Sequence, residues 1–140
     1  MNHALNSVLL IDDDEPTNYI NKMLIEESGF VRQVEVVQSG QAALNYLIHS
    51  SKMNSQYQLP ELIFLDINMP AMNGWEFLSK YNELKVEDKK KTIIIMLTTS
   101  LNPDDELKAY SQPEIAAFES KPLTKDKLIR IFNKYFKIQV

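Results

Sequence analysis

The chain lacks cysteine entirely, and it has only three glycines and two histidines among its 140 residues. Without cysteine it forms no disulfide and uses no thiol in catalysis. No apolar stretch approaches the ~20 residues that a membrane helix needs, and the N-terminus lacks the basic segment of a secretory signal. A net charge of -4 provides no broad basic field for nucleic acid. We therefore expect a cytoplasmic protein with no membrane association and no direct contact to nucleic acid.

The composition that is present, 44% hydrophobic and 24% charged residues, is typical of a globular domain. A chain of this length buries roughly two thirds of its unfolded surface without disulfide or metal staples. The length predicts one domain spanning residues 1–140.

Four short apolar runs each end on a residue that chemistry can use. The runs are Val8 to Ile11, Leu62 to Leu65, Ile93 to Leu97 and Ala116 to Phe118, and a further strand is predicted at Val34 to Val37. The residues at or just after the four ends are Asp12-Asp13-Asp14, Asp66, Thr98 and Lys121-Pro122. If the runs are parallel strands, these residues share the sheet edge where open α/β sheets bind ligands.

Segments with helical periodicity separate the runs. The predicted helices are Pro16 to Glu27 (Ile20, Met23 and Leu24 inward), Gly40 to Ser50 (Leu44, Leu47, Ile48), Gly74 to Leu84 (Phe77, Leu78, Tyr81), a short helix after Asn102-Pro103 (Leu107, Tyr110), and a last helix with Leu128, Ile131, Phe132, Tyr135 and Phe136 on one face. This alternation predicts a doubly wound parallel α/β fold with right-handed crossovers. The polar stretches Ser50 to Gln58 and Lys85 to Lys91 are predicted to be loops.

Each polar segment also has a simpler explanation. The acidic run before Pro16 is typical of a helix start, and Asp66 fits an ordinary loop carboxylate. Thr98 fits a β-branched strand residue, and Lys121-Pro122 fits a surface turn whose proline can be cis. Their joint occurrence at four strand ends favours a common site.

A site that gathers these aspartates needs a cation. Two carboxylates about 4 Å apart repel by roughly 4 kcal/mol at an effective dielectric of ~20. Asp12, Asp13 and Asp66 therefore cannot all ionise cheaply in one cleft without a neutralising charge. Mg²⁺ suits hard oxygen ligands and commonly bridges carboxylates to a phosphate oxygen.

The segments LLIDDDEP, LIFLDINMPAMNGWEFL, IIIMLTTS and FESKPLT resemble, in order and spacing, the receiver domain of two-component response regulators. The resemblance covers nearly the whole chain. It implies a stand-alone, chemotaxis-regulator-like receiver with a flavodoxin-like sheet of five strands in the order 2-1-3-4-5 and five helices. It also implies a phosphoprotein of a bacterial-type phosphorelay, which is a signalling domain and not an enzyme.

The resemblance assigns a role to the residues of the acidic site. It implies that Asp66 accepts a phosphoryl group from a histidine kinase or a histidine phosphotransfer protein, forming an acyl phosphate. Asp12 and Asp13 match the pair that holds Mg²⁺, with Asp66 and the backbone carbonyl of Asn68 as further ligands. Asp14 has no assigned role.

A conformational switch is implied as well. Thr98 and Lys121 match residues that contact the phosphoryl group. Thr98 would be drawn inward, and the ring of Phe118 would turn from an outward to a buried rotamer. The surface around Leu107, Tyr110 and the last helix would then change for a downstream protein target. Two features depart from the family pattern: Phe118 has no phenolic hydroxyl, and residues 114–117 (Glu-Ile-Ala-Ala) replace the usual glycine.

Three alternatives remain open at this point. A phosphatase of the haloacid dehalogenase type needs a second carboxylate where Asn68 stands. A flavodoxin needs a phosphate-binding loop, whereas the run Asp12 to Asp14 would repel the flavin phosphate. A degenerate receiver would act only as an interaction module. Neither His3 nor His49 has the setting of a phosphodonor, and we expect output by protein contact or by relay to another histidine.

Overall fold

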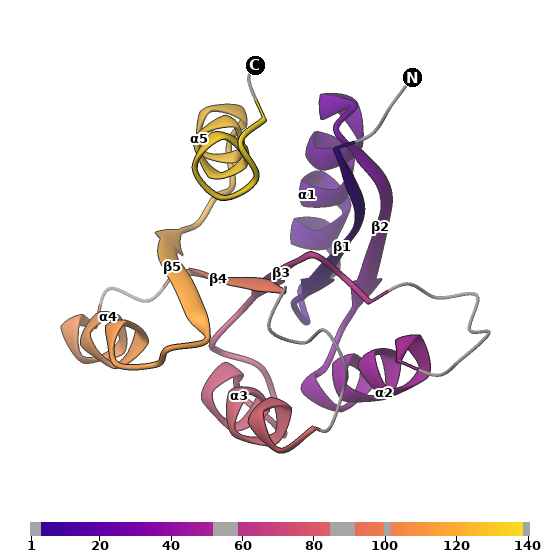
Figure 1. Cartoon of the computed structure of the whole chain (residues 1–140). Helices are drawn as coiled ribbons and strands as arrows, with labels where there is room; N and C mark the ends of the chain where they lie inside the picture. The colour runs from indigo at the N-terminus through magenta and orange to yellow at the C-terminus, as the bar shows by residue number, and fades with distance from the viewer. Residues whose placement is uncertain (1–3, 52–58, 85–91, 100–101, 139–140) are drawn as a thin grey trace.

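The computed structural model describes residues 4–51, 59–84, 92–99 and 102–138, and strands alternate with helices along them (Figure 1). The elements are β1 (Leu5–Ile11), α1 (Glu15–Ser28), β2 (Val31–Val37), α2 (Gly40–Ser50), β3 (Leu62–Leu65), α3 (Gly74–Glu83), β4 (Ile93–Thr98), α4 (Pro103–Tyr110), β5 (Ile115–Ser120) and α5 (Lys125–Phe136). The strands form one parallel sheet in the order β2-β1-β3-β4-β5. The predicted fold and strand order are therefore confirmed.

Helices cover both faces of the sheet, and each strand contributes to both cores because successive side chains point to opposite faces. Val8 and Leu10 of β1 pack in the core that α1 and α5 cover, whereas Leu9 and Ile11 pack in the core that α2 and α3 cover. Figure 1 shows α1 and α5 on one side of the sheet, with α2 and α3 on the other. Strands buried on both faces are apolar at every position, which explains the short continuous runs in the sequence.

The strand bounds differ from the prediction in β1 and in the two edge strands, β2 and β5. The predicted strand Leu62 to Leu65 coincides with β3, and β4 adds only Thr98. In contrast, β1 and β2 begin earlier than predicted, and β5 extends beyond the predicted Ala116 to Phe118 in both directions. β5 is an edge strand in which no residue is fully buried, and it ends on the polar residues Glu119 and Ser120, so apolar residues alone do not mark its limits.

The inward face of α1 was predicted wrongly. Ile20 and Met23 are 55% and 42% exposed, and Leu24 is only partly buried. The buried residues of this helix are Asn18, Asn21 and Ile25. Apolar periodicity failed because the first turns of α1 cover the acidic end of β1, where amide side chains take the place of apolar ones.

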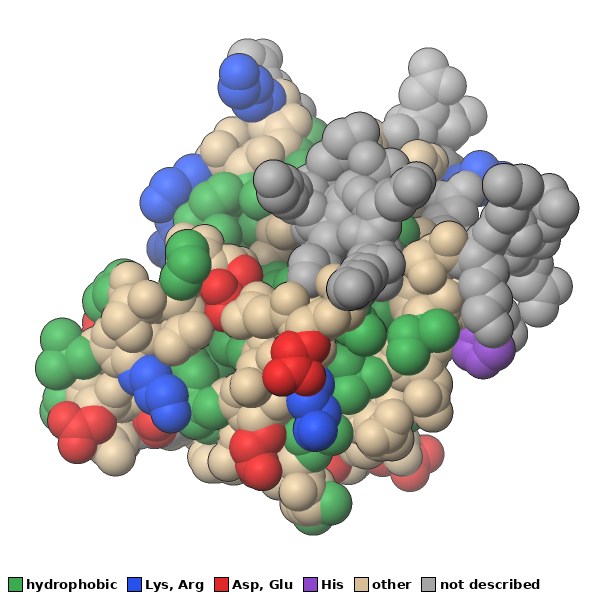
Figure 2. All heavy atoms as spheres, turned by 60° about the horizontal axis from the view of Figure 1, so that its bottom comes forward, with side chains coloured by type: hydrophobic (Ala, Val, Ile, Leu, Met, Phe, Trp, Pro, Cys, Tyr) green, Lys and Arg blue, Asp and Glu red, His purple; other side chains and the backbone are tan. Residues whose placement is uncertain are grey.

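Two other helices also expose residues that apolar periodicity had selected. Ile48 of α2 is 40% exposed, although Leu44 and Leu47 are buried as predicted. In α4, Leu107 and Tyr110 are exposed, and Ala109 is the buried residue. Figure 2 views the side of α2, α3 and α4, and hydrophobic atoms are visible over α4 at its left edge. The eight-residue helix α4 covers too little of the sheet to bury more.

The remaining two helices bury the predicted residues. In α3 these are Phe77, Leu78 and Tyr81, and in α5 they are Leu128, Ile131 and Phe132, with Tyr135 and Phe136 partly buried against the same core. The predicted loops fall mostly at residues 52–58 and 85–91, which lie outside the described residues. Within the described ranges, none of the helices combines the length and apolarity needed to span a bilayer.

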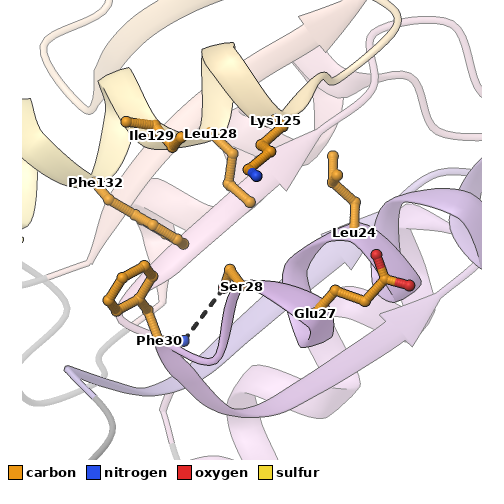
Figure 3. Close-up of a pocket in the computed structure, with 8 residues that line it drawn as sticks. All are labelled: Leu24, Glu27, Ser28, Phe30, Lys125, Leu128, Ile129 and Phe132. Carbon is orange, nitrogen blue, oxygen red and sulfur yellow. Dashed lines mark hydrogen bonds between the residues drawn. The ribbon is translucent and has the colours of Figure 1, made fainter. Parts of the chain in front are cut away.

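A cavity of about 330 Å³ lies between α1 and α5 (Figure 3). Leu24 and Glu27 of α1 face Lys125 and Leu128 of α5 across it. Phe30 and Phe132 meet edge to face at one end, with ring centroids 5.9 Å apart. The cavity lies towards the C-terminal end of α1 and is separate from the acidic residues that precede this helix.

Candidate functional site

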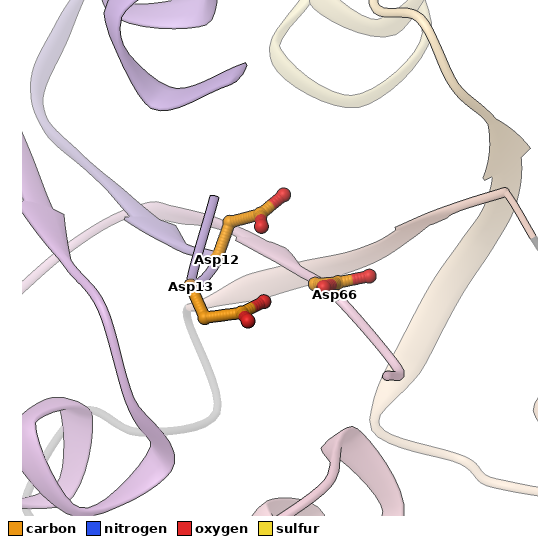
Figure 4. A group of neighbouring side chains, drawn as sticks. All are labelled: Asp12, Asp13 and Asp66. Atoms are coloured by element: carbon orange, nitrogen blue, oxygen red, sulfur yellow. The ribbon is translucent and has the colours of Figure 1, made fainter. Parts of the chain in front are cut away.

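Three carboxylates from two neighbouring strand ends meet at the C-terminal edge of the sheet (Figure 4). Asp12 and Asp13 follow β1 and Asp66 follows β3, and one oxygen of each lies within 4.8 Å of the others. The N–H of Asp66 donates to the carbonyl of Ile11 (3.0 Å), which fixes the two strand ends side by side. Asp12 and Asp66 are buried, and Asp13 is exposed at the mouth of the site.

Lys121 places a positive charge against this cluster. Its Nζ lies 2.6 Å from Oδ2 of Asp12 and 3.4 Å from Oδ1 of Asp66. The lysine follows β5, and its N–H donates to the carbonyl of Thr98 (2.8 Å) at the end of β4. The bond from Lys121 to Pro122 is cis. One ammonium thus opposes three carboxylates.

The electrostatics favour a further cation. Burial raises the pKa of Asp66 to about 6, and the charge of Asp12 adds to the rise while Lys121 opposes it. Burial lowers the pKa of Lys121, but its hydrogen bond to Asp12 and the charges of Asp12 and Asp66 outweigh this effect, so the net pKa is raised. Asp66 therefore ionises less readily than an exposed aspartate unless another positive charge enters the site.

Asp14, which had no assigned role, starts α1. Its side chain accepts hydrogen bonds from the backbone N–H (3.1 Å) and the hydroxyl of Thr17, and these bonds lower the pKa of Asp14. Pro16 occupies the first turn. The simpler explanation of the acidic run, a helix start, is therefore correct for Asp14, while its two predecessors lie in the cluster.

The loop after Asp66 turns back tightly into α3. The N–H of Gly74 donates to the carbonyl of Ile67 (2.7 Å), and a Cβ on Gly74 would lie only 2.6 Å from the backbone oxygen of Asp66. Asn73 caps α3 in a reciprocal arrangement with Glu76. A side chain at Gly74 would displace the backbone that carries Asp66.

The remaining predicted residues surround this cluster at different depths. Asn68 lies in the loop after Asp66 and is exposed. Thr98 is fully buried at the end of β4, opposite Ser120 of β5. Phe118 is half-buried, lies opposite Met96, and packs against the core beneath α2 and α3. The structure thus brings Thr98 next to the backbone of Lys121 and places Phe118 farther down the sheet edge.

Three further contacts were not predicted from the sequence. The Nδ2 of Asn18 donates to the backbone oxygen of Asp12 (2.7 Å). Trp75 of α3 donates from Nε1 to Asp105 of α4 (3.3 Å), and the Nζ of Lys108 lies 4.8 Å from the centroid of the Trp75 ring. The spacing of Asn18 and Asn21 on one helix face was a signal that apolar periodicity ignores. The link between α3 and α4 has no local signal.

Comparison with known proteins agrees with this geometry. The family model for the response regulator receiver domain matches residues 8–133. A solved two-component response regulator from Cytophaga hutchinsonii is 36% identical, with a TM-score of 0.85 over 96% of this chain and 98% of that chain. The probable methanogenesis regulatory protein FilR2 of Methanothrix harundinacea is 32% identical over 88% of this chain and 76% of that protein. Two-component response regulator 24 of Arabidopsis thaliana is 30% identical over 91% and 82%.

The chain therefore belongs to the response regulator receiver domain family. Its role is that of a phosphoacceptor in two-component signal transduction. Receiver domains take phosphoryl groups from histidine kinases and signal to downstream targets, and they are signalling domains, not true enzymes. The phosphatase and the purely structural alternatives are not favoured.

Proposed function

We propose that Asp66 is the phosphoacceptor of this chain, and that Mg²⁺ binds to the carboxylates of Asp12, Asp13 and Asp66 and to the backbone carbonyl of Asn68. One observation carries the proposal. Three carboxylates from two strands share a space of 4.8 Å, and the lysine beside them contacts two of the three. A structural ion pair needs one carboxylate, whereas a phosphoryl site needs a carboxylate nucleophile and cationic partners.

The donor set fits Mg²⁺. All the proposed ligand atoms are hard oxygens, and Asp13 lies on the exposed side, where water can complete the coordination. The excess of carboxylate over ammonium leaves room for a divalent charge. When bound, Mg²⁺ supplies the positive charge that reduces repulsion between the acceptor carboxylate and the incoming phosphoryl oxygens.

The residues of the chain then have separable tasks. An oxygen of Asp66 attacks the phosphorus of a phosphohistidine, the O–P bond forms as the P–N bond breaks, and the imidazole leaves with the electron pair of the broken bond. Lys121 pairs with a phosphoryl oxygen, for which its distance of 3.4 Å from Asp66 is suitable. Thr98 donates its hydroxyl to another oxygen. The charge carried by the phosphoryl group is thereby stabilised from two strands.

The donor is a histidine kinase or a histidine phosphotransfer protein, and the output is a changed surface for a downstream protein. Thr98 moves towards the phosphoryl group, and Phe118 turns into the space that it leaves. The half-buried position of Phe118 in the structure suits such a movement. We propose that the protein acts in the cytoplasm and has no activity beyond its own phosphorylation and dephosphorylation.

The test is treatment with a small acyl phosphate and Mg²⁺, followed by intact-mass measurement. We expect one phosphoryl adduct that is labile to base, and Asp66→Asn should abolish it. Asp104→Asn, an exposed aspartate of α4 outside the cluster, is the matched control and should keep the adduct. Persistence of the same adduct in Asp66→Asn would locate the phosphoacceptor elsewhere.

Binding of Mg²⁺ to the proposed ligands has its own test. Asp13→Ala should weaken Mg²⁺ binding strongly, as measured by NMR titration without phosphate, and lower pH should weaken binding to the unsubstituted protein. An unchanged affinity in Asp13→Ala would remove this residue from the proposed site.

A further inference from the structure

Asn18 is a buried amide whose hydrogen bonding is only half satisfied. Its side chain lies on the inner face of α1 and is 3% exposed. The Nδ2 donates to the backbone oxygen of Asp12, but the buried Oδ1 accepts no hydrogen bond from any described residue. Asparagine is a weaker helix former than leucine or alanine. Its presence in the interior of α1 therefore requires a reason other than helix stability.

The contact with Asp12 fixes which way the amide points. A carbonyl oxygen accepts hydrogen bonds and cannot donate them, so the Nδ2 of Asn18 must face Asp12. The Oδ1 is consequently directed away from that backbone oxygen. An unpaired buried carbonyl is costly, and almost all such groups in native proteins have a partner in the protein or in an ordered water.

A small cavity beside Asn18 offers space for that partner. Its volume is about 10 Å³. Its polar lining residues are Asp12, Asn18, Asn21 and Asp66, and its apolar lining residues are Leu10, Ile11, Phe64 and Leu97. Two of the three aspartates of the cluster thus line the cavity together with Asn18.

One water molecule fits this space in both size and chemistry. The volume is close to the ~10–15 Å³ that a single water requires, and a buried water needs two to four polar partners. Its two hydrogens can be donated to Oδ1 of Asn18 and to a carboxylate oxygen of Asp12 or Asp66. Its lone pairs can accept from the amide of Asn21. A metal ion with its own water shell is too large for the same space.

We infer that Asn18 is a positioning residue for the metal site. It acts directly on the backbone of Asp12 and, through one buried water, on the carboxylates of Asp12 and Asp66, which line the same cavity. Asp12 also donates its N–H to the carbonyl of Val37 in β2 (3.2 Å), accepts from the N–H of Asp14 and pairs with Lys121. Asn18 is the one contact that ties it to the body of α1 among the hydrogen bonds of the described residues. The inference rests on the proposed function only in naming Mg²⁺ as the ion.

The first test is a crystal structure of the unsubstituted, metal-free protein at a resolution that shows ordered water. We expect one water within hydrogen-bonding distance of Oδ1 of Asn18 and of Asp12 or Asp66. Direct donation to this oxygen by another side chain, or an empty cavity, would overturn the water bridge. This measurement depends on neither metal nor phosphoryl group.

The second test separates positioning from a merely structural role. Asn18→Leu removes both hydrogen bonds at similar size, and we expect Mg²⁺ affinity by NMR titration to fall about tenfold, as found for residues that orient metal ligands. Asn18→Ser, which leaves room for a second water, gives a smaller loss and serves if the leucine variant does not fold. Asn133→Leu, an exposed asparagine of α5, should leave the affinity unchanged.

A folded Asn18 variant with reduced thermal stability and unaltered Mg²⁺ affinity would overturn the positioning role. The outcome is distinct from failure of the proposed function. If the unsubstituted protein binds Mg²⁺ but shows no adduct on Asp66, the proposed function is wrong. The positioning role of Asn18 is then still decided by the ordered water in the crystal structure and by the Mg²⁺ affinity of Asn18→Leu.

Discussion

Lys121 lies closer to Asp12 than to Asp66, with distances of 2.6 and 3.4 Å from its Nζ to the two carboxylates. The ammonium therefore neutralises Asp12 more strongly than Asp66, the proposed phosphoacceptor. A divalent ion that binds Asp12 must share that carboxylate with Lys121. In the proposed site, metal and lysine are thus partial competitors for the carboxylate of Asp12, and both would stabilise the phosphoryl group.

This competition gives Lys121→Met opposite effects on two properties. The variant keeps the stem of the side chain and removes its charge. Mg²⁺ should bind about fivefold more tightly, because a repulsive charge worth roughly 1 kcal/mol near the ion has gone. The metal-free protein should be less stable, since buried carboxylates lose their partner. NMR titration and urea unfolding measure the two effects.

The control for this variant is Lys134→Met, which removes an exposed lysine of α5 outside the cluster. It should change neither property. A Mg²⁺ affinity in Lys121→Met equal to that of the control would show that lysine and metal do not share Asp12.

The raised pKa of Asp66 predicts a specific dependence of stability on pH. Its pKa is about 6 in the folded chain, against 3.8 for an ordinary aspartate. Between these values the folded state binds a proton that the unfolded state has lost, so stability falls as pH rises. Allowing for solvent screening at the open side of the site, the loss is roughly 1 kcal/mol.

Asp66→Asn should remove this dependence because the amide does not titrate. In EDTA, urea unfolding at pH 4.5 and 7.5 should give a smaller difference for the variant than for the unsubstituted protein. At the higher pH the variant should be the more stable of the two, as expected when one charge leaves a repulsive cluster. An equal change in unfolding free energy between the two pH values in both proteins would mean that Asp66 ionises normally in the folded chain.

The close approach of α3 to Asp66 makes Gly74 the most sensitive glycine of the site. In Gly74→Ala the new Cβ meets a backbone oxygen, which can move only with the Asp66 loop. We expect a loss of about 2 kcal/mol in unfolding free energy and slower phosphorylation. The matched control is Gly40→Ala, at the start of α2, where the Cβ meets the flexible end of Met72.

Gly40→Ala should lose less stability and keep its phosphorylation rate, because a methionine side chain can adjust. The comparison is made by urea unfolding and by the rate of adduct formation with acyl phosphate. If both variants behave alike, the close approach to Asp66 has no special effect on the acceptor.

The sequence was sufficient for the sheet because burial on both faces gives β1, β3 and β4 a continuous apolar run in Val8 to Ile11, Leu62 to Leu65 and Ile93 to Leu97, and each run stops where the site begins. It was sufficient for the meeting of Asp12, Asp13 and Asp66 because parallel strands bring their C-terminal ends to one edge. The first result follows from burial of the strands on both faces, and the second follows from the common direction of the strands. Neither result requires knowledge of individual side-chain contacts.

The sequence failed where a polar site replaces the core. On α1 the rule that apolar residues face inward selected Ile20 and Met23, but the space beneath that helix is next to Asp12 and favours amides. The acidic run also contains residues with two different roles that no local pattern separates: Asp14 caps a helix, and Asp12 is part of the carboxylate cluster. Contacts between distant segments, such as Trp75 with Lys108, depend on the finished fold.

In the proposed switch, a movement of Thr98 is followed by a rotation of the Phe118 ring. Phe118 packs against the core beneath α2 and α3 and does not belong to the carboxylate cluster. Phe118→Ala should therefore leave phosphorylation of Asp66 largely intact while uncoupling it from changes at the surface around Leu107 and Tyr110. Phe118→Tyr adds a hydroxyl that needs a partner when buried, and it should bias the ring outward by about 1 kcal/mol.

Trp75 provides the measurement, because it is the only tryptophan of the chain and joins α3 to α4 through Asp105 and Lys108. Addition of beryllofluoride and Mg²⁺ should change its fluorescence in the unsubstituted protein, as α4 shifts with the ring of Phe118. The fluorescence change should be lost in Phe118→Ala. This variant should still form the phosphoryl adduct with acyl phosphate, as measured by intact mass. An equal fluorescence change in both proteins, together with unaltered NMR signals of the Phe118 ring, would mean that phosphorylation is communicated through the loop after Asp66, because that loop is directly linked to α3 through Gly74.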